Sequence, residues 1–173
     1  ARYASSACVN SLSSSPRVST SGSILLTLFS WPAVSTFCAA FAVRTPEHLD
    51  FFLHYVDAPI VQEYLSGPEF TIDVMCDLEG TPLSIVPRER VVVRAGVIDR
   101  GRTVNDRRLI ELAQAACAAI RFAGPINIQC RMRDGQPTIF EINPRFSGGI
   151  PLTIQAGADF PARHLVERPH HRA

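Results

Sequence analysis

Two neighbouring segments in the second half of the chain alternate between polar and apolar residues. Residues 126–133 place Ile126, Ile128, Cys130 and Met132 on one face, and Asn127, Gln129, Arg131 and Arg133 on the other. A second extended segment, residues 138–143, follows after four residues that favour a turn. Because side chains of a strand point alternately to the two faces, this pattern predicts a β-hairpin with one buried face.

The turn decides which side chains of this hairpin meet. A two-residue turn of Asp134 and Gly135 pairs Gln129 with Phe140, and places Glu141 on the face opposite Gln129. A three-residue loop ending at Gln136 separates polar from apolar side chains, and this separation favours the longer loop. The pairs then expected are Gln129 with Glu141, Asn127 with Asn143, Ile128 with Ile142, and Cys130 with Phe140.

The expected polar face groups one carboxylate with several amide oxygens, which are ligands that suit a hard divalent cation such as Mg²⁺. Arg145 follows two residues after the second strand and has the forked guanidinium that binds phosphate. Gly148 and Gly149 allow backbone N–H groups to approach an anion closely. The alternative is a polar hairpin face that points into solvent and ends in a loop.

The remaining pattern from residue 44 onward predicts a mixture of helices and strands. Thr45 and Pro46 begin a short amphipathic helix that ends before Pro59. A second helix is capped by Asn105 or Asp106 and stopped by Gly124-Pro125. Strands are expected at 60–65, 70–77, 83–86 and 88–94, and a short helix at 151–156. The fold class is therefore α+β, an antiparallel sheet with packed helices.

Composition excludes several classes of protein. Seventeen basic residues, all arginine, against sixteen acidic ones leave a net charge of +1, which does not suit an electrostatic nucleic-acid binder. Five cysteines form no Cys-x-x-Cys motif, which favours a reducing compartment such as the cytoplasm. Phosphate-loop, Rossmann and serine-nucleophile motifs are not present in the sequence.

The first 43 residues differ from the rest of the chain. They are rich in serine, and residues 24–43 carry no charge. We expect an irregular or disordered segment. The alternative is a membrane anchor at residues 24–43, which is less favoured because Pro32 would interrupt the helix.

Two motifs resemble the ATP-grasp superfamily. Glu141-Ile142-Asn143-Pro144-Arg145 at the end of a strand is similar to the metal- and phosphate-binding signature of this superfamily. The sequence of the motif is most similar to that of the carbamoyl-phosphate-synthase-large-chain-like branch. Residues 62–74 are similar to its hinge strand and the strand that follows. The resemblance implies the C-terminal portion of an ATP-grasp fold at residues 44–168, with a tail at 169–173.

The resemblance also implies roles for individual residues. Glu63 and the backbone of Tyr64 and Leu65 would contact the adenine, and Glu69 would contact the ribose. Gln129, Glu141 and Asn143 would bind Mg²⁺ or, alternatively, Mn²⁺. Arg145 would stabilise charge on the γ-phosphate. The implied reaction is ATP-dependent activation of a carboxylate through an acyl phosphate, followed by attack of an amine or ammonia. The alternative interpretations without a binding role are that Glu63 is an exposed charge at a sheet edge and that Glu69 lies at a solvated strand end.

Other polar residues carry weaker expectations. Arg88, Arg90 and Arg94 share one strand face, which either lines a phosphate cleft or forms a solvated basic surface. Asp73 and Asp77 are interpreted as the polar face of their strand, and Cys130 as a small core residue. The five histidines lack partners at metal-ligand spacing, so no role is assigned to them.

ATP-grasp proteins bind the ATP phosphates with a basic residue and a glycine-rich loop, which the resemblance places before Thr45. In this chain that position is occupied by a serine-rich segment without lysine. An upstream frameshift or a truncated gene would account for this. The alternative function is therefore a truncated, non-catalytic remnant that binds nucleotide weakly or not at all and shows no ligase turnover. The carboxylate substrate and the oligomeric state are not indicated, and membrane association is not favoured.

Overall fold

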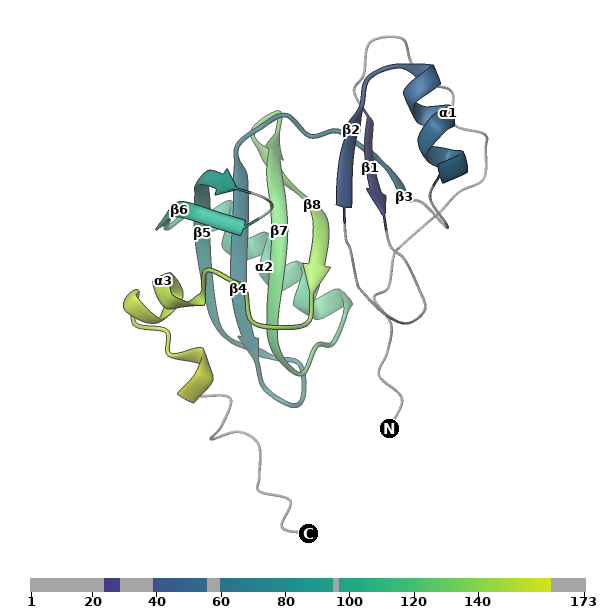
Figure 1. Cartoon of the computed structure of the whole chain (residues 1–173). Helices are drawn as coiled ribbons and strands as arrows, with labels where there is room; N and C mark the ends of the chain where they lie inside the picture. Colours follow the sequence, from purple (N-terminus) through teal and green to yellow (C-terminus); the bar gives the residue numbers. More distant parts are fainter. Residues whose placement is uncertain (1–23, 29–38, 56–59, 95–96, 163–173) are drawn as a thin grey trace. The chain divides into compact units, whose positions relative to one another are not determined.

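Figure 1 shows the computed structural model of the chain, which describes residues 24–28, 39–55, 60–94 and 97–162. The chain divides into two compact units with the boundary between Leu65 and Ser66. Each unit contains its own antiparallel sheet. The boundary expected from the sequence, between residues 43 and 44, falls inside the first unit because strand pairing joins residues on both sides of it.

The first unit holds a three-stranded sheet in the order β2-β1-β3. Its strands are β1 (Ile24–Leu28), β2 (Ala39–Val43) and β3 (Ile60–Glu63). Strand β1 is central and runs antiparallel to both neighbours, so that Leu26 lies opposite Phe41 on one side and Val61 on the other. The strand expected at residues 60–65 is present as β3, and ends two residues earlier.

Strands β1 and β2 lie within the N-terminal segment that the sequence led us to expect to be irregular. They were missed because they are short and uncharged, without the alternation that marks a half-buried strand; β1 pairs with β3, and β2 pairs with β1. The rest of residues 1–43 lies outside the described residues. Within the described part of the chain, no helix is long and apolar enough to cross a membrane.

Helix α1 (Pro46–Tyr55) follows β2 directly and confirms the helix expected there. Thr45 caps it: the Thr45 hydroxyl accepts a hydrogen bond from the N–H of His48 at 3.3 Å, and its carbonyl accepts one from Leu49 at 3.1 Å. Pro46 stands at the first helical position, where it loses no hydrogen bond. Leu49 and Phe52 are its half-buried residues, three positions apart on one face.

The second unit is built on a five-stranded antiparallel sheet in the order β6-β5-β4-β7-β8. The strands are β4 (Glu69–Cys76), β5 (Pro82–Arg94), β6 (Val97–Thr103), β7 (Gly124–Arg133) and β8 (Gln136–Asn143). Asp77 organises the turn between β4 and β5, since its carboxylate accepts hydrogen bonds from the N–H groups of Glu79 and Thr81 at 3.0 and 2.7 Å. Strand β6 was not expected from the sequence.

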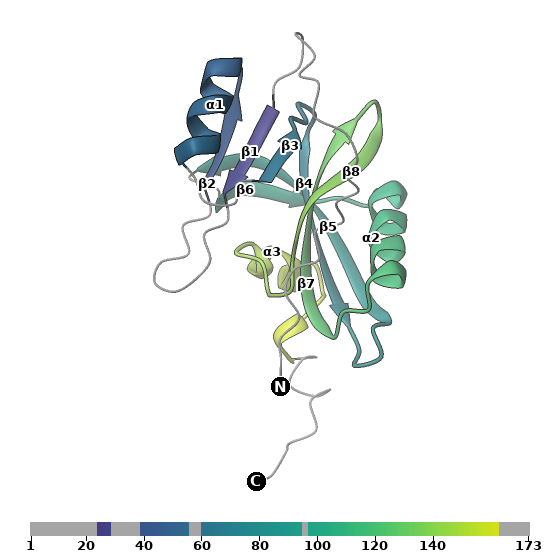
Figure 2. The ribbon, with the colours of Figure 1, turned by 90° about the vertical axis from the view of Figure 1, so that its right-hand side faces the viewer.

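Helix α2 (Arg107–Ala119) covers one face of this sheet (Figure 2). The Asp106 side chain caps it by accepting a hydrogen bond from the N–H of Arg108 at 3.0 Å. The core between helix and sheet consists of Phe70, Ile72, Val74, Cys76, Leu109, Ala113, Cys117, Ile126, Ile128 and Cys130. The expected helix, its cap and its apolar face are confirmed, and so is the core position of Cys130.

The hairpin of β7 and β8 combines the two registers that the sequence analysis compared. The turn has two residues, because Arg133 pairs with Gln136 across Asp134 and Gly135, whose φ angles of 50° and 78° are those of a type I′ turn. The expected three-residue loop is therefore wrong. A bulge then shifts the register by one residue, so Cys130 pairs with Ile139 rather than with Phe140.

Beyond the bulge the pairs are those that polar and apolar segregation predicted. Gln129 lies opposite Glu141, and Asn127 lies opposite Asn143. Ile128 pairs with Ile142 on the face that packs against α2. The expected polar face of the hairpin is therefore confirmed even though the turn differs.

Helix α3 (Ile150–Gln155) lies on the side of the sheet opposite α2 (Figure 2). A second, smaller apolar cluster lies with it: Met75, Ala158 and Phe160, joined by Val86, Phe146 and Ile150. Both faces of β4 are therefore covered, and its residues from Phe70 to Cys76 are all buried. The arrangement confirms the expected α+β class, an antiparallel sheet with packed helices.

The larger cluster supplies the first prediction. Ile128 is fully buried at the centre of the sheet, and truncating it to alanine leaves a cavity that the neighbouring strands and α2 cannot fill. We expect Ile128→Ala to lower the free energy of unfolding by about 2–5 kcal/mol, measured by urea denaturation. The control is Leu78→Ala in the β4–β5 turn, where the side chain is 57% exposed and the change should stay within about 0.5 kcal/mol.

Candidate functional site

The face of the sheet opposite α2 carries a continuous set of polar side chains. Because directly paired residues of antiparallel strands share a face, the pairings align them in rows across the sheet. The rows are Arg90, Glu69 and Arg131; Arg88, Thr71, Gln129 and Glu141; and Asp73, Asn127 and Asn143. Helix α3 and the apolar residues around Met75 cover only one end of this face. We call these three rows the polar face.

Asp73 is the most connected residue of the polar face, and it is 1% exposed. Its Oδ2 atom accepts a hydrogen bond from Arg88 Nε at 2.9 Å and lies 2.8 Å from Arg88 Nη2. The same oxygen accepts a hydrogen bond from the Thr153 hydroxyl, and Oδ1 accepts one from Asn127 Nδ2 at 3.1 Å. Arg88 Nη2 in turn donates to the Ser147 hydroxyl at 2.7 Å. One carboxylate thus connects four elements of the unit.

This cluster corrects two interpretations made from the sequence. Asp73 was expected on the polar face of its strand and lies there, but it is buried because α3 and the segment before it cover that end of β4. Arg88 is not part of a solvated basic surface: it is 1% exposed and ion-paired. Arg90 is held in a similar way, with its side chain 7% exposed and paired with Glu69. The side chain of Arg94 lies outside the described residues.

Glu69, expected to contact a ribose, lies between two arginines. Its Oε1 atom is 2.8 Å from Arg90 Nη1, and its Oε2 atom accepts a hydrogen bond from Arg131 Nη2 at 2.5 Å. Arg90 Nη1 also donates to Gln129 Oε1 at 2.7 Å. The side chains of Glu69, Arg90 and Gln129 are therefore held together at the open end of the polar face.

The three residues expected to bind a metal lie together, with Gln129 in the middle of β7 and Glu141 and Asn143 at the end of β8. Gln129 and Glu141 are direct cross-strand neighbours, and Asn143 follows Glu141 by two residues on the same face. Among the described residues the Glu141 carboxylate has no ion-pair or hydrogen-bond partner, and the buried Asn143 Nδ2 atom has none either. No cluster of three or more His, Cys, Asp or Glu residues occurs in the described ranges. A metal site here would consist of one carboxylate and amide oxygens.

Comparison with known proteins places the fold. A sequence profile described as "ATP-grasp in the biosynthetic pathway with Ter operon" matches residues 56–172, more than half of the chain. The chain belongs to the ATP-grasp family. The match includes the whole described part of the second unit, and with it the polar face.

Curated relatives of this ATP-grasp chain are large chains of carbamoyl phosphate synthase. The protein from Agathobacter rectalis is 31% identical over 106 residues, which cover 55% of this chain and 10% of that protein. The protein from Thermoanaerobacter sp. is 28% identical over 107 residues, covering 56% and 10% respectively. The chain thus spans about a tenth of the length of these curated relatives.

Solved structures with a similar fold include two ligases. D-alanine–D-alanine ligase from Bacillus anthracis matches with a TM-score of 0.60 and 15% identity, over 86% of this chain and 53% of that chain. L-amino acid ligase from Bacillus licheniformis matches with a TM-score of 0.58 and 19% identity, over 84% and 38%. These likenesses establish the fold, and they confirm the expectation of a partial ATP-grasp module.

The expected nucleoside contacts of the ATP-grasp chain lie in the first unit, apart from Glu69. Glu63 ends strand β3, where it pairs with Ile24 and is exposed. Tyr64 is 38% exposed, whereas Leu65 is buried. Nothing in the second unit tests their roles, which remain predictions.

The loop after β8 carries Arg145 and the two glycines. Arg145 is exposed, and its Nη1 atom donates to the carbonyl of Phe146 at 3.0 Å. A Cβ atom on Gly149 would lie 2.1 Å from Arg88 Nη1, so any larger residue there would have to displace the buried guanidinium. A Cβ on Gly148 would meet no atom within 4 Å. Close backbone approach at Gly149 therefore serves Arg88, which the sequence analysis did not foresee.

The structure adds Asp73, Arg88, Ser147 and Thr153 to the residues that organise the polar face. The ion pair between Asp73 and Arg88 could have been predicted from one feature of the sequence: opposite charges occupy the same face of two successive strands. No sequence feature predicts the contacts of Ser147 and Thr153 with this pair, because these residues reach it only after the chain has crossed to the other side of the sheet.

The buried pair provides the second prediction. Asp73→Asn leaves the Arg88 guanidinium buried without its counter-charge, and we expect the free energy of unfolding to fall by about 3–5 kcal/mol in urea denaturation. Glu89→Gln is the control: Glu89 pairs with Arg102, whose side chain is 71% exposed, and its loss should cost less than about 1 kcal/mol. Equal effects of the two substitutions would contradict a special role for the buried pair.

Proposed function

We propose that the chain binds ATP together with Mg²⁺ on the polar face, as the nucleotide-binding part of an ATP-grasp ligase. The observation that carries this proposal is the hairpin register, which aligns Gln129 with Glu141 and leaves the Glu141 carboxylate without a compensating cation among the described residues. An uncompensated, half-buried carboxylate beside amide oxygens suits a bound divalent cation. The family membership of the chain supports the same assignment.

Gln129, Glu141 and Asn143 are the proposed metal ligands. Gln129 Oε1 already accepts a hydrogen bond from Arg90, but an amide oxygen has two lone pairs and can also bind a cation. That hydrogen bond fixes the orientation of the Gln129 amide, with its oxygen end held in place. Mg²⁺ bound there would neutralise charge on the ATP phosphates. All-oxygen ligands and a single carboxylate match the preference of Mg²⁺ for sites it shares with phosphate oxygens and water.

Arg145 is the proposed contact to the transferred phosphate. It lies two residues after Asn143, and one nitrogen of its guanidinium donates to the backbone of Phe146. Its other nitrogens have no protein partner among the described residues and are available to form a bidentate contact with phosphate oxygens. A fixed positive charge at this position would stabilise charge that develops on the γ-phosphate during transfer.

Glu63, Tyr64 and Leu65 are proposed to contact the adenine, and Glu69 the ribose hydroxyls. Glu69 already accepts hydrogen bonds from two arginines, which use about half of the lone pairs of a carboxylate. Its two oxygens can therefore still accept hydrogen bonds from ribose hydroxyl groups. In this arrangement Arg90 and Arg131 would hold the Glu69 carboxylate in position for the ribose.

The reaction proposed for the full ligase is ATP-dependent activation of a carboxylate. Phosphoryl transfer to the carboxylate forms an acyl phosphate, and an amine or ammonia then displaces the phosphate. The residues of this chain would contribute orientation and charge stabilisation, the two terms that dominate phosphoryl transfer. The competing possibility is a chain that has kept the fold and lost nucleotide binding.

The third prediction tests nucleotide binding directly. ATP with excess Mg²⁺ should raise the midpoint of thermal unfolding of the full chain, and a concentration of 100 times Kd should add about 2.7 kcal/mol of stability. Chelation of the metal with EDTA should abolish the shift, because the phosphates would then face the Glu141 carboxylate without a cation between them. The absence of any shift at millimolar ATP and Mg²⁺ would favour the remnant.

Isothermal titration with Mg²⁺ and a non-hydrolysable ATP analogue provides the residue-level test. Glu141→Gln removes a charged ligand, and we expect affinity to fall at least about tenfold, the equivalent of 1.4 kcal/mol. Glu111→Gln on the exposed face of α2 removes the same charge away from the polar face and should leave affinity unchanged. Equal affinity of the two variants would contradict the proposed metal site.

A further inference from the structure

Two cysteine thiols meet in the core between the sheet and helix α2. The Sγ atoms of Cys76, the last residue of β4, and Cys117 in α2 are 3.8 Å apart, although the residues are separated by 41 positions in the chain. Both are free thiols, and their exposed fractions are 2% and 1%. The sulfur atoms are in van der Waals contact. Bringing them to the bonded separation of about 2.05 Å requires an approach of about 1.7 Å.

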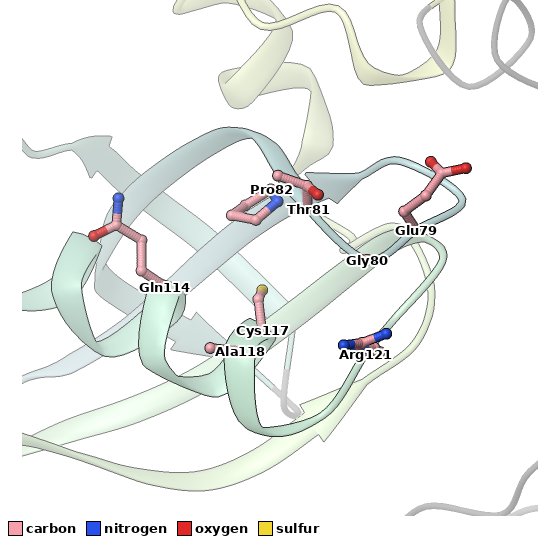
Figure 3. A pocket seen from close by; sticks show the side chains of 8 residues that line it. All are labelled: Glu79, Gly80, Thr81, Pro82, Gln114, Cys117, Ala118 and Arg121. Carbon is pink, nitrogen blue, oxygen red and sulfur yellow. The ribbon is translucent and has the colours of Figure 1, made fainter.

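A pocket of about 510 Å³ borders Cys117. It lies between the last turns of α2 and the β4–β5 turn, and its lining includes Gly80, Thr81, Pro82, Gln114, Cys117 and Arg121. Figure 3 shows the Cys117 side chain projecting from α2 toward Thr81 and Pro82. Cys117, although only 1% exposed, is therefore one of the residues that line the pocket, which lies on the face of the sheet opposite the polar face.

The two thiols differ in acidity. The contact between the two thiols, in which either sulfur can donate the hydrogen bond, lowers the pKa of Cys117 and raises the pKa of Cys76. The thiolate is the nucleophilic form of cysteine, so Cys117 is the attacking residue and Cys76 the resolving one. The pocket and the acidity thus point to the same sulfur.

We propose that Cys76 and Cys117 form a reversible disulfide when the protein meets hydrogen peroxide, and that the pocket beside α2 admits the oxidant. The Cys117 thiolate attacks one peroxide oxygen, the O–O bond breaks, and hydroxide leaves and takes up a proton to form water. Cys117 is then a sulfenic acid. The Cys76 sulfur loses its proton and attacks the Cys117 sulfur, the S–O bond breaks, and a second water leaves. Two thiols are oxidised and one peroxide is reduced to two waters.

The disulfide would join α2 covalently to β4 and close a long loop of chain. Cross-links across long loops restrict the unfolded chain and so stabilise the folded state. Residues of the polar face take no part in the reaction, since β4 directs Cys76 toward α2 and Asp73 away from it. Oxidation would therefore make the α2–sheet core more rigid while leaving the hydrogen bonds of Asp73 in place.

The fourth prediction is tested on the full chain treated with a small excess of hydrogen peroxide and digested without reduction. Mass spectrometry should find the peptides of Cys76 and Cys117 joined, with the loss of two hydrogens, and dithiothreitol should separate them. The oxidised protein should unfold about 10 °C higher than the reduced protein. Recovery of the two peptides unlinked after peroxide, or of Cys117 linked to Cys8, Cys38 or Cys130 instead, would overturn the proposal.

Matched variants separate disulfide formation from general oxidation. Cys117→Ser and Cys76→Ser should each abolish the difference in midpoint between oxidised and reduced samples. Cys130→Ser removes a thiol that is equally buried in the same core and should leave that difference unchanged. Because each variant is compared with its own reduced form, a loss of basal stability does not affect the result. A difference that persists in Cys117→Ser contradicts the proposal.

Discussion

The buried ion pair between Asp73 and Arg88 is the contact on which the second unit's arrangement depends. Two charges inside a protein are stable only when every hydrogen-bonding atom around them has a partner, since each has lost its hydration shell. Asp73 meets this condition with donors from Arg88, Asn127 and Thr153. These donors come from β5, β7 and α3, so satisfying one carboxylate fixes three elements against β4. The Ser147 hydroxyl adds the loop before α3 by accepting from Arg88.

The same pair explains how a polar face can be both ordered and chemically available. The end of the face near Asp73 is covered by α3, and the Asp73 carboxylate is satisfied within the protein, whereas the Nη1 atom of Arg88, which lies against Gly149, and the Nδ2 atom of Asn143 have no hydrogen-bond partner among the described residues. At the other end, Arg90 and Arg131 hold Glu69 in place. Glu141 lies between these two rigid ends without a protein partner among the described residues. A ligand there would meet side chains already held in position, which reduces the entropy cost of binding.

Sequence reasoning identified elements with local signals and missed those that depend on distant partners. Helix α2 was predicted from its apolar spacing and the cap at Asp106, because both signals lie within a few residues of the helix. The burial of Asp73 on the polar face of its strand was not predicted, because it depends on Thr153, which is 80 positions away in the chain. Strands β1 and β2 were missed for a related reason, since they lack an alternation of their own and belong to a sheet in which β1 pairs with the more distant β3. The membrane-anchor alternative arose from the same uncharged run, which contains strands β1 and β2.

The β7–β8 hairpin shows how two conflicting local preferences can both be met. Asp134 and Gly135 favour a two-residue turn, whereas the polar and apolar side chains farther along favour the register of a three-residue loop. The bulge between the pairs Cys130–Ile139 and Gln129–Glu141 absorbs the difference of one residue. It follows that the turn does not set the alignment of Gln129 with Glu141. That alignment is set instead by burial of Ile128 and Ile142 against α2, so the core on one face determines which oxygens meet on the other.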